Sequence, residues 1–127
     1  MSQYVRDFMT KRLITVSLSD SVAKAMKLMS DNQTHSVLIP REGRSWSIFT
    51  QTDLLIALDD GEDPNNISVG YYASPLKFTA RPDWDYKKAL DVMVRNGVKH
   101  LPVMDNDGNV LGIVSSKDII EISRKDG

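Results

Sequence analysis

Near its C-terminal end the sequence reads Gly112-Ile113-Val114-Ser115-Ser116-Lys117-Asp118-Ile119-Ile120, an apolar run that passes into a polar helix start. A shift of 65 positions places Ser115 on Thr50 and Asp118 on Asp53. Earlier positions match at a shift of 64 instead, so one residue has been added between the expected second and third strands of the later copy. Such ordered self-similarity indicates an internal duplication.

Each copy predicts the same order of elements: strand, helix, strand, strand, helix. The expected strands are 13–16, 36–39 and 46–50 in the first copy and 77–80, 100–104 and 110–115 in the second. Helices are expected after the N-caps Ser19 and Asp83, and two more close the copies at 51–58 and 116–123. Apolar stripes at i, i+3, i+4 and i+7 support the first helix of each copy, at Val22, Ala25, Met26 and Met29 and at Tyr86, Ala89, Leu90 and Met93. Gly97 suits a left-handed helix end, and tight turns are expected at 105–108 and 41–44.

The duplication divides the chain into repeat 1 at 1–60, an acidic linker at 61–68 and repeat 2 at 69–127. Each repeat has three short strands and would be only marginally stable alone. We therefore expect an α+β fold in which two βαββα units pack face to face about a pseudo-two-fold axis.

Composition narrows the range of functions. The formal net charge is −1 and Lys and Arg are dispersed, which disfavours nucleic-acid binding. The chain has no Cys and 2 His, which leaves few constellations for thiol catalysis, disulfides or metal binding, so we expect no enzyme and no metal. No apolar run has the length of a signal peptide or membrane span, so we expect a cytoplasmic protein.

The doubled element order, with the stretches 97–103 and 112–118, resembles the CBS (cystathionine-β-synthase) domain pair, or Bateman module, over residues from about 5 to 122. The resemblance implies a regulatory module that binds AMP, ADP or ATP in clefts between its two units; S-adenosylmethionine and NAD stay open as ligands. It also implies a disc-like homodimer and a regulated protein, while no cofactor is required. No effector domain is visible in the 127 residues, so we expect the pair to act alone, self-associated or on a separate partner.

The chemistry of such a site fits the strand-to-helix junctions. A helix N-terminus offers unpaired N–H groups and positive potential to a phosphate, to which the hydroxyl of Thr50 or Ser115 can add a hydrogen bond. A carboxylate three residues later, Asp53 or Asp118, can accept both hydroxyls of a ribose. The same pattern is also an ordinary helix cap, so both interpretations stay open.

The resemblance distributes further residues over two clefts, each shared between the units. The Asp53 cleft comprises His35, Thr50, Thr52, Asp53, Lys77, Phe78, Thr79, Val98 and Pro102. The Asp118 cleft comprises Leu13, Ile14, Thr15, Thr34, Leu38, Lys99, His100, Ser115, Lys117 and Asp118. Phe78 is expected to stack on the base, and Lys99 to pair with phosphate. Because Leu38 and Ser47 depart from the pattern, we expect the Asp53 cleft to be the better-formed site.

The main alternative is a scaffold that binds no ligand and serves dimerisation or partner docking. In that case the aspartates only cap helices. Aromatic residues outside the apolar stripes, at Trp46, Tyr71, Tyr72 and Trp84, would then be candidate contacts.

Overall fold

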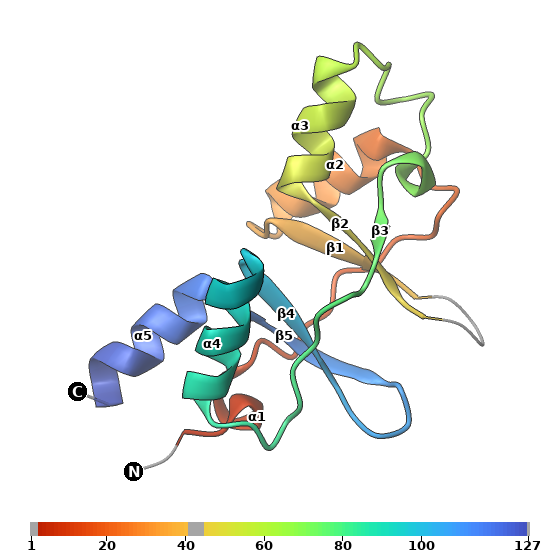
Figure 1. The fold of residues 1–127 in the computed structure, drawn as a ribbon. Coiled ribbons are helices and arrows are strands. Elements are labelled where there is room, and N and C mark those ends of the chain that lie inside the picture. Colours follow the sequence, from red (N-terminus) through yellow and green to blue (C-terminus); the bar gives the residue numbers. More distant parts are fainter. Residues whose placement is uncertain (1–2, 41–44, 127) are drawn as a thin grey trace. The chain divides into compact units, whose positions relative to one another are not determined.

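The computed structural model describes residues 3–40 and 45–126, which form two compact units (Figure 1). The middle unit comprises residues 14–76. The outer unit combines the N-terminal segment, up to Leu13, with the chain from Lys77 onward. The middle unit holds the two longer helices and the antiparallel strand pair of repeat 1, and the outer unit holds those of repeat 2, so the predicted mixed α+β fold of two βαββα-type units is confirmed.

The middle unit is a three-stranded sheet with two helices. It contains α2 (Val22–Asp31), β1 (Ser36–Ile39), β2 (Ser47–Thr50), α3 (Gln51–Asp59), the 3-10 turn η1 (Val69–Tyr71) and β3 (Ser74–Pro75). The sheet order is β1-β2-β3, and both pairings are antiparallel. Val37 lies opposite Phe49, and both side chains are fully buried in the core of this unit.

The outer unit is built on a β-hairpin. It contains α1 (Val5–Phe8), α4 (Tyr86–Asn96), β4 (His100–Met104), β5 (Val110–Ser115) and α5 (Ser116–Asp126). The hairpin is antiparallel, with Leu101 opposite Val114. The turn at 105–108 is confirmed, with Gly108 at φ 83°. Gly97 ends α4 in the predicted left-handed conformation, at φ 64°.

The apolar stripes were predicted correctly except at one position. Val22, Ala25 and Met29 are buried in the middle unit, and Tyr86, Ala89 and Met93 are buried in the outer unit. Leu90 is 39% exposed, so its prediction as a core residue was wrong. It lies one helical turn from the more exposed Val94, on the side of α4 that the core does not cover.

The expected first strand of each repeat is reduced to a single parallel bridge. Thr15 pairs with Leu38 in the middle unit, and Ala80 pairs with Val103 in the outer unit. The predicted strands 13–16 and 77–80 were therefore too long. The third strand of repeat 1 begins at Ser47 rather than at residue 46. The turn expected at 41–44 lies outside the described residues.

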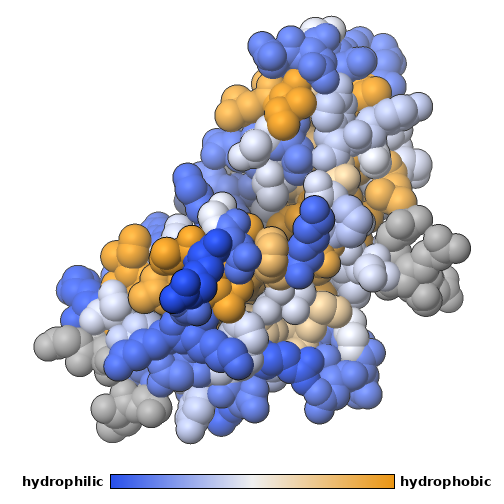
Figure 2. Space-filling model, in the orientation of Figure 1, coloured by the Kyte–Doolittle hydropathy of each residue, from blue (hydrophilic) through white to orange (hydrophobic). Residues whose placement is uncertain are grey.

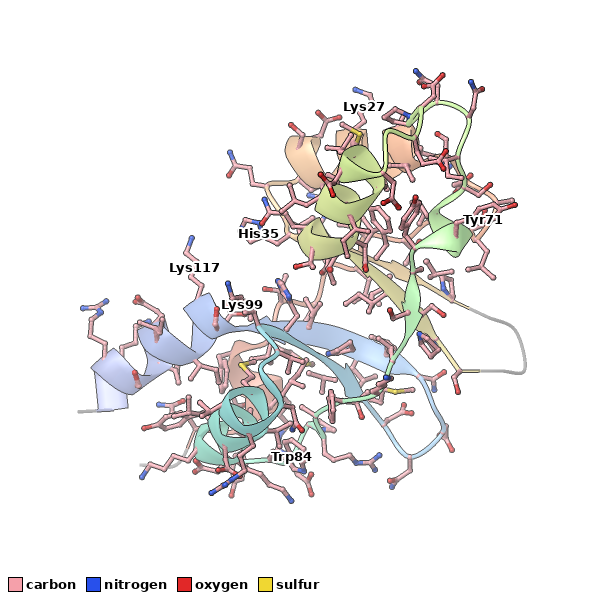
Figure 3. All side chains as sticks on the ribbon, turned by 45° about the horizontal axis from the view of Figure 1, so that its top comes forward. Lys27, His35, Tyr71, Trp84, Lys99 and Lys117 are labelled. Atoms are coloured by element: carbon pink, nitrogen blue, oxygen red, sulfur yellow. The ribbon has the colours of Figure 1, made fainter. Side chains whose placement is uncertain are left out.

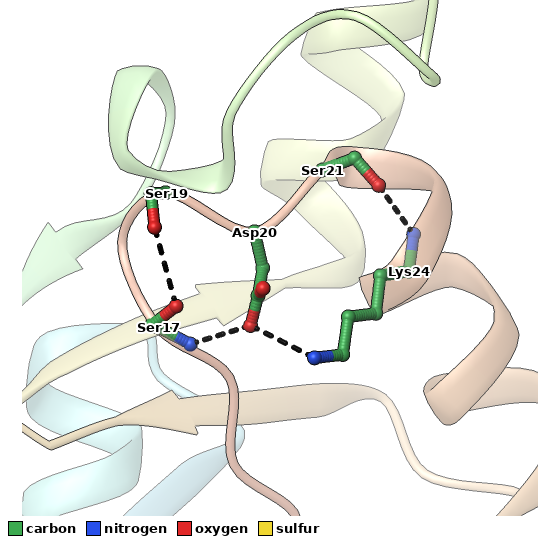
Figure 4. Close-up of polar contacts among 5 residues, drawn as sticks. All are labelled: Ser17, Ser19, Asp20, Ser21 and Lys24. Atoms are coloured by element: carbon green, nitrogen blue, oxygen red, sulfur yellow. Dashed lines mark hydrogen bonds and ion pairs between the residues drawn. The ribbon is translucent and has the colours of Figure 1, made fainter.

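The helix caps were misplaced by two residues. The side chain of Ser21, not Ser19, accepts the first-turn N–H of α2, and Asp85, not Asp83, does so in α4. Ser19 instead belongs to a turn that the carboxylate of Asp20 closes (Figure 4). Asp20 Oδ2 accepts the N–H of Ser17 at 2.8 Å and forms an ion pair with Lys24 Nζ at 3.2 Å. The hydrogen bond from the Ser17 N–H, helped by Lys24, lowers the pKa of the Asp20 carboxyl.

The first residues of each repeat pack on the other repeat. Thr10 exchanges two main-chain hydrogen bonds with Ile113, both at 2.9 Å, and thereby extends the edge of the β4–β5 hairpin. In the middle unit, β3 pairs with Ser47 and Ile48. The compact units therefore differ from the sequence repeats, since the expected linker 61–68 and the start of repeat 2 pack with repeat 1. An unpaired strand edge has main-chain donors and acceptors that an extended segment can satisfy, which explains the exchange.

Candidate functional site

The start of α3 is a complete capping box. Asp53 Oδ2 accepts the N–H of Thr50 at 2.8 Å and lies 3.2 Å from the Thr50 hydroxyl, which in turn accepts the Asp53 N–H at 3.4 Å. The N–H of Gln51 donates to the carbonyl of His35 at 2.9 Å. Three of the four N–H groups at the start of α3 are thus satisfied within the middle unit.

The start of α5 repeats this geometry in the outer unit. Asp118 Oδ2 accepts the N–H of Ser115 at 2.9 Å, and the hydroxyl of Ser115 accepts the Asp118 N–H at 3.3 Å. The N–H of Ser116 donates to the carbonyl of Lys99 at 2.9 Å. Each bond has a counterpart at the matching repeat position in α3.

Each helix start therefore has fewer open donors than the sequence suggested. Among the described residues, the N–H groups of Thr52 and Lys117 have no hydrogen-bond acceptor, whereas their helical neighbours do. The expectation that several unpaired N–H groups would await a phosphate is wrong, because main-chain carbonyls and the capping residues occupy most of them. Sequence reasoning missed these carbonyls of His35 and Lys99, since a main-chain acceptor leaves no side-chain signature.

In each of the two aspartates, one carboxylate oxygen has no described hydrogen bond. Every hydrogen bond described for the carboxylates of Asp53 and Asp118 uses Oδ2, so Oδ1 has no described hydrogen bond in either residue. Capping and ligand binding are therefore compatible for the same carboxylate. Burial raises the pKa of the half-buried Asp53 carboxyl, and the hydrogen bonds from Thr50 oppose this effect.

The structure divides the residues of each predicted cleft between the two units. The middle unit holds His35, Thr50, Thr52 and Asp53 of one cleft and Ile14, Thr15, Thr34 and Leu38 of the other. The outer unit holds Leu13, Lys99, His100, Ser115, Lys117 and Asp118, together with Lys77, Phe78, Thr79, Val98 and Pro102. Each predicted cleft draws on both units, so its closure stays a prediction. We call the groups around α3 and α5 the α3 half-site (His35, Thr50, Thr52, Asp53) and the α5 half-site (Lys99, His100, Ser115, Lys117, Asp118).

Several predicted base-pocket residues have structural roles. Ile14 and Val98 pack against the cores of their units. Pro102 is fully buried, and its carbonyl accepts the N–H of Ala80 at 2.8 Å. Phe78 is 37% exposed and is the most exposed apolar residue of this group.

Comparison with known proteins identifies the family. Residues 5–60 and 73–125 each match the CBS domain. The chain belongs to the CBS-domain family. The two repeats are a pair of CBS domains, as the sequence predicted, and no catalytic domain is evident in the chain.

Curated relatives of this CBS pair are mostly longer proteins without an assigned function. The chain is 29% identical over 120 residues to the uncharacterized protein MJ0188 of Methanocaldococcus jannaschii, covering 94% of this chain but 44% of that protein. It is 28% identical over 112 residues to the uncharacterized protein MK0525 of Methanopyrus kandleri, covering 87% of this chain and 57% of that protein. The chain thus spans about half the length of these relatives.

Solved CBS pairs have the same fold. The CBS domain pair of protein MJ0100, in complex with 5′-methylthioadenosine and S-adenosyl-L-methionine, superposes with TM-scores of 0.89 and 0.83 in two crystal structures. These are 23% and 25% identical to this chain and cover 100% and 98% of it, and all of the other chain. The hexameric CBS-CP12 protein from bloom-forming cyanobacteria has a TM-score of 0.86 at 24% identity, over 94% of this chain and 67% of that one.

Within 3–40 and 45–126 no helix has the length and apolar character needed to cross a membrane. In the same ranges no three His, Cys, Asp or Glu residues cluster in a way that could hold a metal ion.

Proposed function

We propose that this CBS pair is a regulatory sensor that binds an adenosyl ligand, of the AMP, ADP or ATP type or related to S-adenosylmethionine, and has no catalytic activity of its own. Its place of action would be the cytoplasm. The ligand would lie in the clefts predicted from the sequence, each formed by a half-site of one unit and base-pocket residues of the other.

The observation that carries the proposal is the matched geometry of the two half-sites. In both, a carboxylate is held at a helix start through Oδ2 while Oδ1 is left available to accept hydrogen bonds. A ribose edge presents two hydroxyl donors, and a carboxylate is an acceptor. The CBS pair of MJ0100, a relative that reaches 25% identity and the same fold, is complexed with two adenosyl compounds, which supports this class of ligand.

The decisive experiment is a thermal-shift panel of AMP, ADP, ATP, 5′-methylthioadenosine, S-adenosylmethionine and NAD. A ligand at about 100 times its dissociation constant adds about 2.7 kcal/mol of stability. Each kcal/mol of added stability raises the melting temperature by roughly 4–8 °C in a domain of about 60–100 residues, and by less in a larger domain. The expected shift is therefore readily measurable.

Variants assign the shift to the half-sites. Asp53→Asn keeps the size of the side chain and should remove part of the shift, and Asp118→Asn should remove the rest. Asp107→Asn, an exposed substitution in the β4–β5 turn, serves as the control that keeps the full shift. If both half-site variants together keep the full shift, the ligand lies elsewhere.

A second candidate is a ligand-free dimerisation scaffold, and exposed apolar residues favour it. Leu55, Ile56 and Leu58 are exposed on α3 of the middle unit, and Leu90 and Val94 on α4 and Ile120 on α5 are exposed in the outer unit. Figure 2 shows apolar residues gathered over these helices on the face that it draws. Tyr71, at 78% exposed, is the most open of the predicted aromatic contacts, since Trp84 and Tyr72 pack partly against the cores. The scaffold explanation replaces the sensor if no compound in the panel shifts the melting curve while sedimentation shows a dimer.

A further inference from the structure

The two half-sites carry different charges at matching positions. Lys117 stands in α5 where Thr52 stands in α3, and Lys99 precedes β4 where His35 precedes β1. Both lysines are exposed, and Figure 3 shows their side chains projecting from the end of the outer unit at which α5 begins. The bond from the Ser116 N–H to the Lys99 carbonyl holds their backbones next to each other.

The net charges of the two units differ in the same direction as the half-sites, since the outer unit is basic and the middle unit is acidic. The outer unit has 12 Lys and Arg against 9 Asp and Glu, whereas the middle unit has 4 against 8. The net charge of −1 therefore conceals a basic unit and an acidic unit of similar size. Such a field raises the local concentration of anions at one unit and lowers it at the other.

Lys117 occupies a position that local helix preference disfavours. It lies in the first turn of α5, where the positive end of the helix dipole repels a cation. In the described part of the chain no salt bridge includes Lys117 or Lys99. A bound anion would convert this local cost into attraction, because it would face the two ammonium groups and the helix start together.

The scarcity of open main-chain donors makes these side chains decisive. With the Lys117 N–H as the open donor of the α5 start, a phosphate must take its remaining contacts from side chains. Lys99 and Lys117 can supply charged donors there, whereas Thr52 supplies a neutral hydroxyl at the α3 start. Lys77, which the sequence assigns to the Asp53 cleft, adds a single cation there against two at the α5 half-site.

We infer that the two sites select different adenosyl ligands: the α5 half-site takes a phosphate-bearing adenosine nucleotide, and the α3 half-site takes an adenosine derivative without phosphate. The inference rests on the proposed function and assigns a ligand class to each of its two sites. The protein would then compare a nucleotide with an uncharged or cationic adenosyl compound, instead of binding two copies of one ligand.

The test is isothermal titration of single-site variants with ADP and with 5′-methylthioadenosine. Asp53→Asn leaves the α5 half-site, which should bind ADP more tightly than 5′-methylthioadenosine. Asp118→Asn leaves the α3 half-site, which should show the opposite order. A reciprocal exchange then isolates the charge: Lys117→Thr should weaken ADP binding at the α5 half-site by about five- to tenfold, and Thr52→Lys should strengthen it at the α3 half-site by a similar factor. Binding of 5′-methylthioadenosine should change less than about twofold, because it brings no phosphate to the exchanged side chain.

The outcomes separate this inference from the proposed function. If the wild-type protein binds no adenosyl compound, the proposed function fails and the inference fails with it. If it binds them but both sites rank the two ligands alike, or the exchange alters both ligands equally, the inference alone is overturned. Should an Asn variant lose its fold by circular dichroism, the two exchanges are made in the wild-type background. The affinity for ADP must then fall more steeply with added salt in the wild type than in Lys117→Thr, and equal salt slopes would refute the inference.

Discussion

In the outer unit the N–H of Val5 donates to the carbonyl of Trp84 at 2.8 Å, and in the middle unit the N–H of Val69 donates to the carbonyl of Asp20 at 2.9 Å. The side chains at these acceptor positions differ entirely. Asp20 forms an ion pair with Lys24, whereas the ring of Trp84 lies under the ammonium group of Lys88, with Nζ 4.6 Å from the ring centroid. Both arrangements place a lysine over the turn before the helix. The duplicated frame is thus fixed by main-chain bonds, which leaves the side chains free to diverge in chemistry.

The two units also differ in the main-chain bonds themselves where one repeat has a proline. The N–H of Leu38 donates to the carbonyl of Ile14 at 2.9 Å, but Pro102 stands at the matching position and has no N–H. In the outer unit the bond is instead made two residues further along both segments, from the N–H of Met104 to the carbonyl of Ala80 at 2.9 Å. The segment that carries Phe78 is therefore held differently from the segment that carries Ile14, which is consistent with the greater exposure of Phe78.

The largest expected effect tests the exchange of the leading segments. Val5 and Val69 are equivalent and fully buried, so Val5→Ala and Val69→Ala should each lower the free energy of unfolding by about 2 kcal/mol. Denaturant unfolding measures the loss, and amide hydrogen exchange locates it. Although Val5 belongs to repeat 1, its variant should loosen β4 and β5, whereas the Val69 variant should loosen β1 and β2. Loss of protection in β1 and β2 of the Val5 variant would contradict the exchange.

A smaller effect is expected where one unit needs a glycine and the other does not. A Cβ on Gly112 would lie 2.7 Å from the Thr10 carbonyl oxygen and 2.9 Å from Met9 Sδ. Gly112→Ala should therefore cost about 1–2 kcal/mol and displace the N-terminal segment, because a main-chain atom has to move. Ser47, at the matching position, already has a Cβ, so Ser47→Ala is the control and should cost clearly less. Equal losses in the two variants would show that the close approach of Thr10 does not constrain the outer unit.

Much of the frame could be predicted from the sequence because it rests on periodicity and turn chemistry. The β4–β5 hairpin followed from apolar strands around an Asp-Asn-Asp-Gly turn, and Gly97 from its place after an apolar stripe. The exchange of leading segments could not be predicted. The repeat matches Val5 to Val69, but periodicity says nothing about which copy a flanking segment pairs with.

The misplaced caps and the half-sites show a further limit of prediction from the sequence. Ser19 and Ser21 both fit the spacing of an N-cap, and the choice depends on Asp20, whose carboxylate closes the turn before the helix. At the half-sites the residue types at Thr50 and Asp53 predicted the capping box. The occupation of the neighbouring N–H by a carbonyl depends on the path of the chain before β1, which side-chain patterns do not record.

The smallest expected effect is a contrast in pH dependence between two aspartates of the middle unit. Burial raises the pKa of Asp53 above the ordinary value of 3.8, so the folded state holds its proton more tightly than the unfolded state does. The contribution of Asp53 to stability should therefore fall as the pH rises from 3.8 through its raised folded-state pKa. Asp20 has a lowered pKa, so its contribution is present above 3.8 and is lost as the pH falls through the lowered value.

The two asparagine variants should then respond with opposite slopes. In urea unfolding from about pH 3 to about pH 6, the stability of Asp53→Asn relative to the wild type should rise with pH, and that of Asp20→Asn should fall. Any loss from weakened capping adds a constant offset to each curve and leaves its slope unchanged. A flat curve for Asp53→Asn would mean that folding leaves the pKa of the Asp53 carboxyl unchanged, as expected if water still solvates its Oδ1. A ribose would then have to displace that water, and the advantage of a carboxylate held ready at the start of α3 would be lost.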